Sequence, residues 1–350
     1  MLPNKITEQL NITYPIIQAP MAGGITTTSL IIEVANAGGL GMIGAGYLTP
    51  EQTKKQIAEI KQLTEKPFGI NLFTPQSFVV HTQDINQALT LLDPICKQLE
   101  LDNLTVPSIP TYEEILGSFQ QQIEIIIAEK VPICSFTFGI PSKEIIEQLK
   151  GANILLIGTA TTLEEAKLVE EVGFDMVVLQ GQEAGGHRGS FTANAPKAGI
   201  ELNEFIRQTN QAIDIPLIAS GGIMDEHGIK TVLELGADAV QMGTAFLTCE
   251  ESGAHPIYKS AIIQANKTDL QLTCAFSGKW AQGIQNDFMQ YMEKYEHLLP
   301  PFPVQNALTQ SIRKQAALLN NTAYMSLWSG HNPQLAKQQS VKALMDALTL

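Results

Sequence analysis

Residues 216–244 read PLIASGGIMDEHGIKTVLELGADAVQMGT, a stretch in which two short apolar runs flank a helical segment. The runs 216–219 and 239–242 have the length and composition of buried strands. Each run leads into glycine, the first at Gly221 and Gly222 and the second at Gly243. This arrangement is typical of a βαβ unit in a parallel sheet.

The same kind of unit recurs along the chain. Residues 162–172 have helical periodicity and end at Gly173, and the turn VGFDMV at 172–177 is similar to LGADAV at 235–240. Eight βα units in about 250 residues predict an α/β protein with a closed (β/α)8 TIM barrel, and a doubly wound open sheet is the structural alternative. The predicted strands are 16–19, 41–44, 68–72, 133–136, 154–157, 176–180, 216–219 and 239–242.

Two stretches do not fit the regular alternation. Residues 74–130 form one long connection after the third strand, and residues 250–325 follow the eighth strand with many aromatic and polar residues. Insertions at the carboxyl side of barrel strands usually cover an active site. We expect a barrel over 1–249 with an insertion at 74–130, a helical lid or substrate lobe over 250–325, and a C-terminal helix over 326–350 that packs back on the barrel.

Composition excludes several classes of protein. Of 350 residues, 44% are apolar, and 22 Lys and Arg against 35 Asp and Glu give a net charge of −13. A chain this acidic repels nucleic acid and anionic membrane surfaces. The start lacks the features of a signal peptide, no apolar run has the length of a membrane span, and four distant cysteines do not have zinc-site spacing. We expect no metal, reduced thiols and a cytoplasmic location.

The two glycine turns predict a phosphate site. In barrels, the loops after the seventh and eighth strands often bind phosphate, because exposed backbone N–H groups and a helix N-terminus face the anion. Here these loops contain Gly221 and Gly222 after one strand, and Gly243 and Thr244 after the next. A phosphate-bearing cofactor is therefore implied; the alternative is that the glycines only let the chain turn.

Three further segments leave the catalytic ends of predicted strands. The run QGQEAGGHRGSF at 180–191 follows the sixth strand and holds His187 among glycines, where an imidazole can approach a ligand and titrate near neutral pH. The loop QAPMAGG at 18–24 can place backbone N–H groups against a flat ring, or is a plain turn. Asn71 ends the third strand, and its amide can bond a ring or phosphate, or cap the chain.

Together these segments resemble the nitronate monooxygenase family, formerly called 2-nitropropane dioxygenases, which are FMN-dependent (β/α)8 barrels. The run EAGGHRG at 183–189 resembles the class I signature most specifically. The resemblance implies that His187 is the catalytic residue and that the backbone of Met21, Ala22 and Gly23 lies near the flavin ring. It implies FMN contacts from Asn71, Gln180, Gly185, Gly222, Gln241, Met242, Gly243 and Thr244. Relatives often read Ser-Gly-Arg-Pro-Ala-Arg-Gly where this chain has SGKWAQG at 277–283, and Gln where it has His331.

The implied reaction is oxidative denitrification, a detoxification by a flavoprotein monooxygenase. A small-molecule nitronate such as propionate 3-nitronate, or a nitroalkane after loss of its α-proton, is oxidised with O2 to a carbonyl compound and nitrite. His187 is then the base for a neutral nitroalkane or, when protonated, holds the nitro oxygens. The main alternative is an FMN-dependent NAD(P)H reductase of the same superfamily, acting on enoyl-ACP or quinones, and a more distant one is a non-catalytic flavin-binding barrel.

Overall fold

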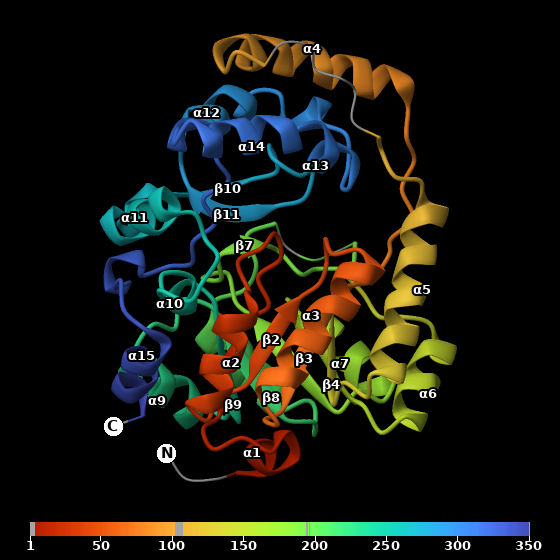
Figure 1. Cartoon of the computed structure of the whole chain (residues 1–350), viewed down its shortest axis with the longest axis vertical. Coiled ribbons are helices and arrows are strands. Elements are labelled where there is room, and N and C mark those ends of the chain that lie inside the picture. Colours follow the sequence, from red (N-terminus) through yellow and green to blue (C-terminus); the bar gives the residue numbers. More distant parts are fainter. Residues whose placement is uncertain (1–3, 102–107, 194, 196, 350) are drawn as a thin grey trace.

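The computed structural model describes residues 4–101, 108–193, 195 and 197–349 (Figure 1). Eight parallel strands form one sheet in the order β1-β9-β8-β6-β5-β4-β3-β2. The sheet closes on itself, because Leu40, just before β2, accepts a hydrogen bond from the Gln18 N–H at 2.9 Å and donates one to the Ile16 carbonyl at 2.9 Å. The strands are β1 (Ile16–Gln18), β2 (Gly41–Gly44), β3 (Phe68–Phe73), β4 (Ile133–Thr137), β5 (Leu155–Ala160), β6 (Met176–Gln180), β8 (Leu217–Ser220) and β9 (Ala239–Met242).

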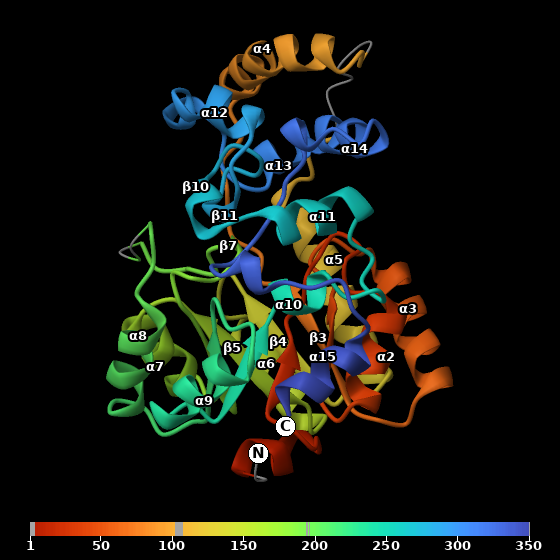
Figure 2. The same cartoon turned by 90° about the vertical axis from the view of Figure 1, so that its left-hand side faces the viewer.

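This closed sheet confirms the predicted TIM barrel and excludes the doubly wound alternative. An outer ring of helices surrounds it: α2 (Thr28–Asn36), α3 (Pro50–Leu63), α5 (Tyr112–Ala128), α6 (Lys143–Gly151), α7 (Leu163–Glu171), α8 (Leu202–Asn210), α9 (Glu226–Glu234) and α15 (Val341–Leu348). The C-terminal helix α15 packs between α2 and α9, where it completes the ring (Figure 2). Helix starts are fixed by side-chain caps; Thr49, which precedes α3, for example, accepts a hydrogen bond from the Gln52 N–H.

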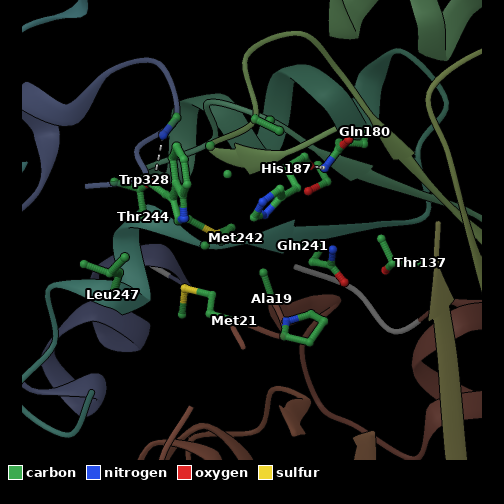
Figure 3. A pocket seen from close by; sticks show the side chains of 18 of the residues that line it. Ala19, Met21, Thr137, Gln180, His187, Gln241, Met242, Thr244, Leu247 and Trp328 are labelled. Carbon is green, nitrogen blue, oxygen red and sulfur yellow. Dashed lines mark hydrogen bonds between the residues drawn. The ribbon is translucent and has the colours of Figure 1, made fainter. Parts of the chain in front are cut away.

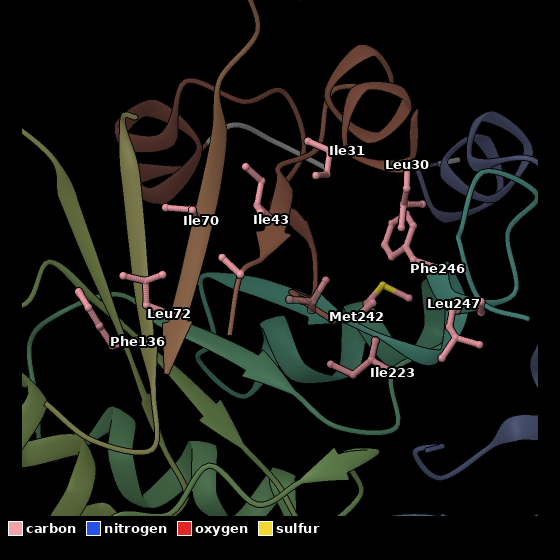
Figure 4. Close-up of a cluster of buried hydrophobic side chains, with 14 of the residues drawn as sticks. Leu30, Ile31, Ile43, Ile70, Leu72, Phe136, Ile223, Met242, Phe246 and Leu247 are labelled. Carbon is pink, nitrogen blue, oxygen red and sulfur yellow. The ribbon is translucent and has the colours of Figure 1, made fainter. Parts of the chain in front are cut away.

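The outer faces of the strands form the main core. Figure 4 shows Ile43, Ile70, Leu72 and Phe136 of neighbouring strands among the buried apolar side chains that also include Ile31 of α2. Because parallel strands are covered on their outer faces by helices, these positions read as continuous apolar runs, which is why the strands were visible in the sequence.

The inside of the barrel differs between its two ends. Helix α1 (Lys5–Leu10) closes the amino end, where Ile6 and Leu10 pack against inward-facing apolar side chains. These are Ile17, Met42, Ile133, Ile157, Met176, Val178, Ile218 and Ala239. One or two residues further along the strands the inward positions become polar, so the barrel has a sealed apolar floor and a polar upper layer.

A separate lobe covers the carboxyl ends of the strands (Figure 1). Its helices are α11 (Pro256–Gln264), α12 (Asp287–Glu293), α13 (Val304–Leu308) and α14 (Gln310–Leu318), with short 3-10 turns η1 (Lys267–Asp269), η2 (Glu296–Leu298), η3 (Thr322–Tyr324) and η4 (Pro333–Leu335). We expected a helical lobe, but the lobe also contains strands. Its β10 (Leu270–Thr273) and β11 (Ala281–Ile284) form an antiparallel sheet with β7 (Gly186–His187). Helix α10 (Thr244–Leu247) leads from the barrel into the lobe.

The long connection after β3 divides between barrel and lobe. Helix α4 (Thr82–Gln98) lies on the lobe, where the Gln315 side chain of α14 donates a hydrogen bond to the Leu99 carbonyl at 3.2 Å (Figures 1 and 2). Helix α5 packs on α3 at the barrel wall. The insertion therefore joins the lobe to the barrel along one side, in addition to the chain connections at α10 and α15.

Candidate active site

A pocket occupies the mouth of the barrel under the lobe. Figure 3 shows open space between His187 and Trp328 on one side and Ala19 and Met21 on the other. All but one of the residues proposed from sequence line this pocket: Met21, Ala22, Asn71, Gln180, Gly185, His187, Gly222, Gln241, Met242, Gly243 and Thr244. Gly23 does not line it; this residue has a φ of 87° in an exposed turn beside Gly24, and the loop curves away after Ala22.

The upper layer of the barrel gives the pocket polar but uncharged walls. Asn71 donates hydrogen bonds to Ser135 Oγ at 2.8 Å and to Thr137 Oγ1 at 3.1 Å. Thr159, Gln180, Ser220 and Gln241 continue this layer around the barrel. Among the described residues lining the pocket, none is Asp, Glu, Lys or Arg. A flat, neutral heterocycle with both donors and acceptors matches such a wall, because amides and hydroxyls supply both kinds of partner.

The glycine turns lie at one edge of the pocket. Gly222 has a φ of 66°, which favours glycine. The backbone N–H groups of Gly222, Gly243 and Thr244 have no hydrogen-bond partner among the described residues. A Cβ added at Gly243 would lie 3.7 Å from Ala19 Cβ, so the open side of this residue faces the pocket. Free N–H groups in open space suit an anion such as phosphate.

A segment near the C-terminus braces these turns. Asn332 Nδ2 donates a hydrogen bond to the Gly222 carbonyl at 2.9 Å, and the Gly330 N–H donates to Thr244 Oγ1 at 3.0 Å. A Cβ on Gly185 would lie 2.4 Å from the Gly330 nitrogen, so only glycine fits there. The sequence suggested no role for this segment, yet Trp328 and Gly330 line the pocket. A contact between residues so distant in the chain leaves no local signal.

His187 is held from three directions. Its backbone pairs with Ala281 of β11, and its carbonyl accepts a hydrogen bond from Gln180 Nε2 at 3.0 Å. The same Gln180 side chain accepts from the Gly189 N–H at 2.8 Å, so it spans the histidine loop. The imidazole Nε2 lies 2.8 Å from Ser277 Oγ of the lobe. Gln180, which we expected to contact the cofactor, therefore also positions His187.

Arg188, the next residue, holds the histidine loop together through hydrogen bonds from its buried side chain. Its side chain is 4% exposed and donates to the carbonyls of Ala184 at 2.9 Å and Gln182 at 2.8 Å. It also donates to Gln282 Oε1 of β11 at 3.2 Å. The Gln282 amide oxygen is an acceptor that a second guanidinium would not provide. The histidine loop is thus folded around Arg188 and tied to the lobe.

Burial keeps the His187 imidazole neutral. Its pKa is lowered to about 3, chiefly because burial disfavours the charged ring and further because Lys279 and Arg313 are nearby. At neutral pH the ring therefore carries no charge and keeps a lone pair on one nitrogen. Of the two roles suggested from sequence, the base agrees with this state, and a protonated ring that holds nitro oxygens does not.

This lowered pKa predicts how stability depends on pH. Between pH 6.5 and about 3, the unfolded chain protonates this imidazole whereas the folded chain does not, so stability falls as the pH drops. We expect His187→Asn to lose less stability than the wild type between pH 7 and pH 4, by roughly 1–3 kcal/mol. Urea unfolding at both pH values measures the difference. Equal losses in the two proteins would show that His187 titrates normally.

Aromatic side chains enclose His187 on the lobe side. Phe138 lies 6.1 Å, Phe302 6.5 Å and Trp328 5.4 Å from its ring, measured between ring centroids. Phe138 has a φ of 72°, unusual for a residue with a side chain, and such conformations cluster at functional sites. The sequence showed that the lobe is rich in aromatic residues but not that these rings surround His187. The Phe-Gly pair at the end of β4 was a local signal that could have identified Phe138.

Two kinds of feature do not occur in the described parts of the chain. No group of three or more His, Cys, Asp or Glu side chains comes together there in a way that could hold a metal ion. None of the helices described has both the length and the apolar character needed to cross a bilayer. The four cysteines are buried and unbonded.

Comparison with known proteins adds independent findings. A model of the nitronate monooxygenase family matches residues 4–350. A probable nitronate monooxygenase of Staphylococcus haemolyticus is 49% identical over 99% of this chain and 96% of its own, and one of Bacillus subtilis is 44% identical over 99% and 98%. A nitroalkane oxidase structure from Streptomyces ansochromogenes has a TM-score of 0.90 at 35% identity, covering 98% of this chain and 96% of that one. FabK from Thermotoga maritima has a TM-score of 0.77 at 27% identity, covering 99% and 95%.

Proposed function

The chain belongs to the nitronate monooxygenase family of oxidoreductases, and we propose that it binds FMN and uses O2 to oxidise alkyl nitronates, such as propionate 3-nitronate, to a carbonyl compound and nitrite. One observation carries the proposal. The neutral imidazole of His187 faces the same uncharged, polar pocket that has free N–H groups at its glycine edge.

The residues present fit FMN. The N–H groups at Gly222, Gly243 and Thr244 would hold the phosphate, and the space that a Cβ at Gly243 would enter remains open for it. The amides of Asn71, Gln180 and Gln241 would hold the polar edge of the ring, and Met21 and Ala22 would pack near its face. When bound, FMN supplies the redox chemistry between substrate and O2.

The chain itself supplies a base and a dry, shaped site. Ser277 Oγ, within hydrogen-bond distance of the His187 ring, fixes its orientation. The neutral imidazole takes the α-proton of a nitroalkane and so generates the nitronate; a substrate that arrives as the nitronate does not need this step. The rings of Phe138 and Trp328 beside His187 would exclude water around the reacting carbon.

Two measurements test this proposal. We expect the purified protein to release FMN, one per chain, on denaturation, as identified by chromatography against FMN and FAD standards. In an oxygen electrode, a nitronate is expected to start O2 consumption, with nitrite appearing in the same cell. A protein that carries one FMN and neither consumes O2 nor forms nitrite with any nitronate would overturn the proposed reaction.

The similarity to the FabK structure supports a second candidate function, the NAD(P)H-dependent reductase suggested from sequence. The nitroalkane oxidase structure matches with the higher TM-score and identity, which favours the nitronate reaction. Family membership identifies an oxidoreductase, so the non-catalytic flavin-binding barrel is not supported. Rapid reduction by NADH or NADPH would distinguish the reductase.

A further inference from the structure

A short segment near the C-terminus holds both glycine turns. We call residues 328–332 the strap. Its Gly330 N–H donates a hydrogen bond to Thr244 Oγ1 at 3.0 Å, and its Asn332 Nδ2 donates to the Gly222 carbonyl at 2.9 Å. Each turn is therefore tied to the strap by one hydrogen bond, although the strap lies far from both turns in the sequence.

Other contacts fix the position of the strap itself. The His331 N–H donates to the Glu183 carbonyl of the histidine loop at 2.9 Å, and the Tyr258 hydroxyl of α11 donates to the Trp328 carbonyl at 2.6 Å. Trp328 also forms an antiparallel bridge with Gly283 of β11. Because these anchors come from the barrel and from the lobe, the strap is held independently of the two turns that it contacts.

The bonds from the strap determine what the turns can offer a ligand. The Asn332 amide holds the Gly222 carbonyl, so it fixes the trans peptide plane whose N–H belongs to Ile223, and this N–H points away from Asn332. The Ile223 N–H has no hydrogen-bond partner among the described residues. Thr244 Oγ1 accepts from Gly330 and donates to no described group, so its hydroxyl hydrogen is left for a ligand.

The orientation of these donors matters because the turns lack a cation. None of the described residues lining the pocket is Lys or Arg, so a phosphate at the turns would be held by N–H and hydroxyl groups. A hydrogen bond weakens steeply as its angle closes, and donors that are fixed in advance lower the free-energy cost of binding. Asn332 does not itself line the pocket, so it can affect a ligand there only through Gly222.

The backbone of Asn332 suits an asparagine. Its φ is 65°, in the left-handed region that asparagine and glycine adopt more readily than other residues. Glycine would accept the same backbone conformation but would provide no side-chain donor. Asparagine combines this conformation with the hydrogen bond to Gly222.

We propose that the strap clamps the phosphate end of the cofactor, and that Asn332 is a positioning residue that acts through Gly222 to slow the release of FMN. This inference rests on the cofactor of the proposed function and not on its reaction. Asn332 makes no contact with FMN in this arrangement. Since the strap acts on the turns, it strengthens the binding of FMN and not that of riboflavin, which has the same ring but no phosphate.

Flavin titration of the full-length chain, after removal of bound flavin, tests the clamp with Asn332→Gly. Glycine keeps the left-handed backbone and removes the donor. We expect the Kd and the dissociation rate of FMN to rise about three- to tenfold, the equivalent of one hydrogen bond, and the Kd of riboflavin to stay within about twofold. Flavin fluorescence measures both ligands, and thermal unfolding verifies the fold.

Two further variants separate positioning from a general loss of structure. Asn320→Gly changes an exposed lobe asparagine with a φ of 52°, whose side chain forms no hydrogen bond with the described residues, and should alter neither Kd. Asn332→Asp keeps the shape of the side chain but replaces the donor with a carboxylate, and should also weaken FMN more than riboflavin. Unchanged FMN affinity in both folded Asn332 variants, or an equal loss of FMN and riboflavin affinity, would overturn the clamp.

Failure of the proposed function gives a different result. If the holoenzyme carries FMN but oxidises no nitronate, the proposed reaction is wrong, and the comparison of FMN with riboflavin still decides the clamp. A wild-type chain that binds neither flavin in the titration would overturn both the proposed cofactor and the clamp.

Discussion

His187→Asn is expected to lower kcat/KM for a neutral nitroalkane by about 10²- to 10⁴-fold, the usual contribution of a general base. Burial keeps the imidazole neutral and Ser277 Oγ orients it, so the ring has a free lone pair to offer to the α-proton. Asparagine keeps a polar group near Ser277 but does not accept a proton near neutral pH. A nitronate is already deprotonated, so its turnover should fall by less than about tenfold, and FMN content should be unchanged.

The measurement uses separate stocks of nitroalkane and preformed nitronate, each assayed before the two forms interconvert. His227→Asn, a change to an exposed histidine on α9, serves as the matched control and should affect neither substrate. Equal loss on nitroalkane and nitronate would show that His187 acts on a step common to both. Unchanged nitroalkane turnover would exclude it as the base.

Gly243→Val is expected to give a folded protein that is purified almost without FMN. Gly243 has an ordinary negative φ of −104°, and a Cβ there meets only Ala19 and Met21 at 3.7 Å or more, so the fold tolerates the side chain. That side chain points into the pocket beside the free N–H groups, where it displaces the phosphate. The measurement is the flavin to protein absorbance ratio, with thermal unfolding to verify the fold.

The control for this prediction is a glycine with equal space but no role in the pocket. Gly117 on α5 has no atom near an added Cβ, so Gly117→Val should keep its flavin. Gly222→Val is a weaker test, because a φ of 66° adds backbone strain and a Cβ there would lie 3.0 Å from Glu183 Cβ. A fully flavinylated Gly243→Val protein would contradict the proposed phosphate position.

Sequence reasoning recovered those parts of the molecule that local pattern determines. Buried parallel strands are apolar on both faces, so each barrel strand was visible as a short run, although β5 extends to Ala160, beyond the predicted end at 157. Glycines at strand ends and the run around His187 marked the mouth of the barrel. The residues so predicted converge on one pocket because the carboxyl ends of all eight strands meet there.

Contacts between distant segments were not predictable from local pattern. Ser277 is 90 residues from His187, and the small sheet forms only when β11 meets β7, a two-residue strand too short to leave a periodic signal. Arg188 next to His187 would ordinarily be a solvated side chain, and only the fold shows that the loop encloses it. The family resemblance placed the backbone of Gly23 near the ring, but its positive φ serves a turn outside the pocket.

The central claim, that this pocket is the site of a flavin-dependent nitronate oxidation, is tested most directly by anaerobic mixing of the purified yellow protein with propionate 3-nitronate in one cell and with NADH or NADPH in another. We predict that the nitronate bleaches the flavin absorbance within the mixing time and that neither nicotinamide does. Bleaching by a nicotinamide alone would contradict the account and identify a reductase.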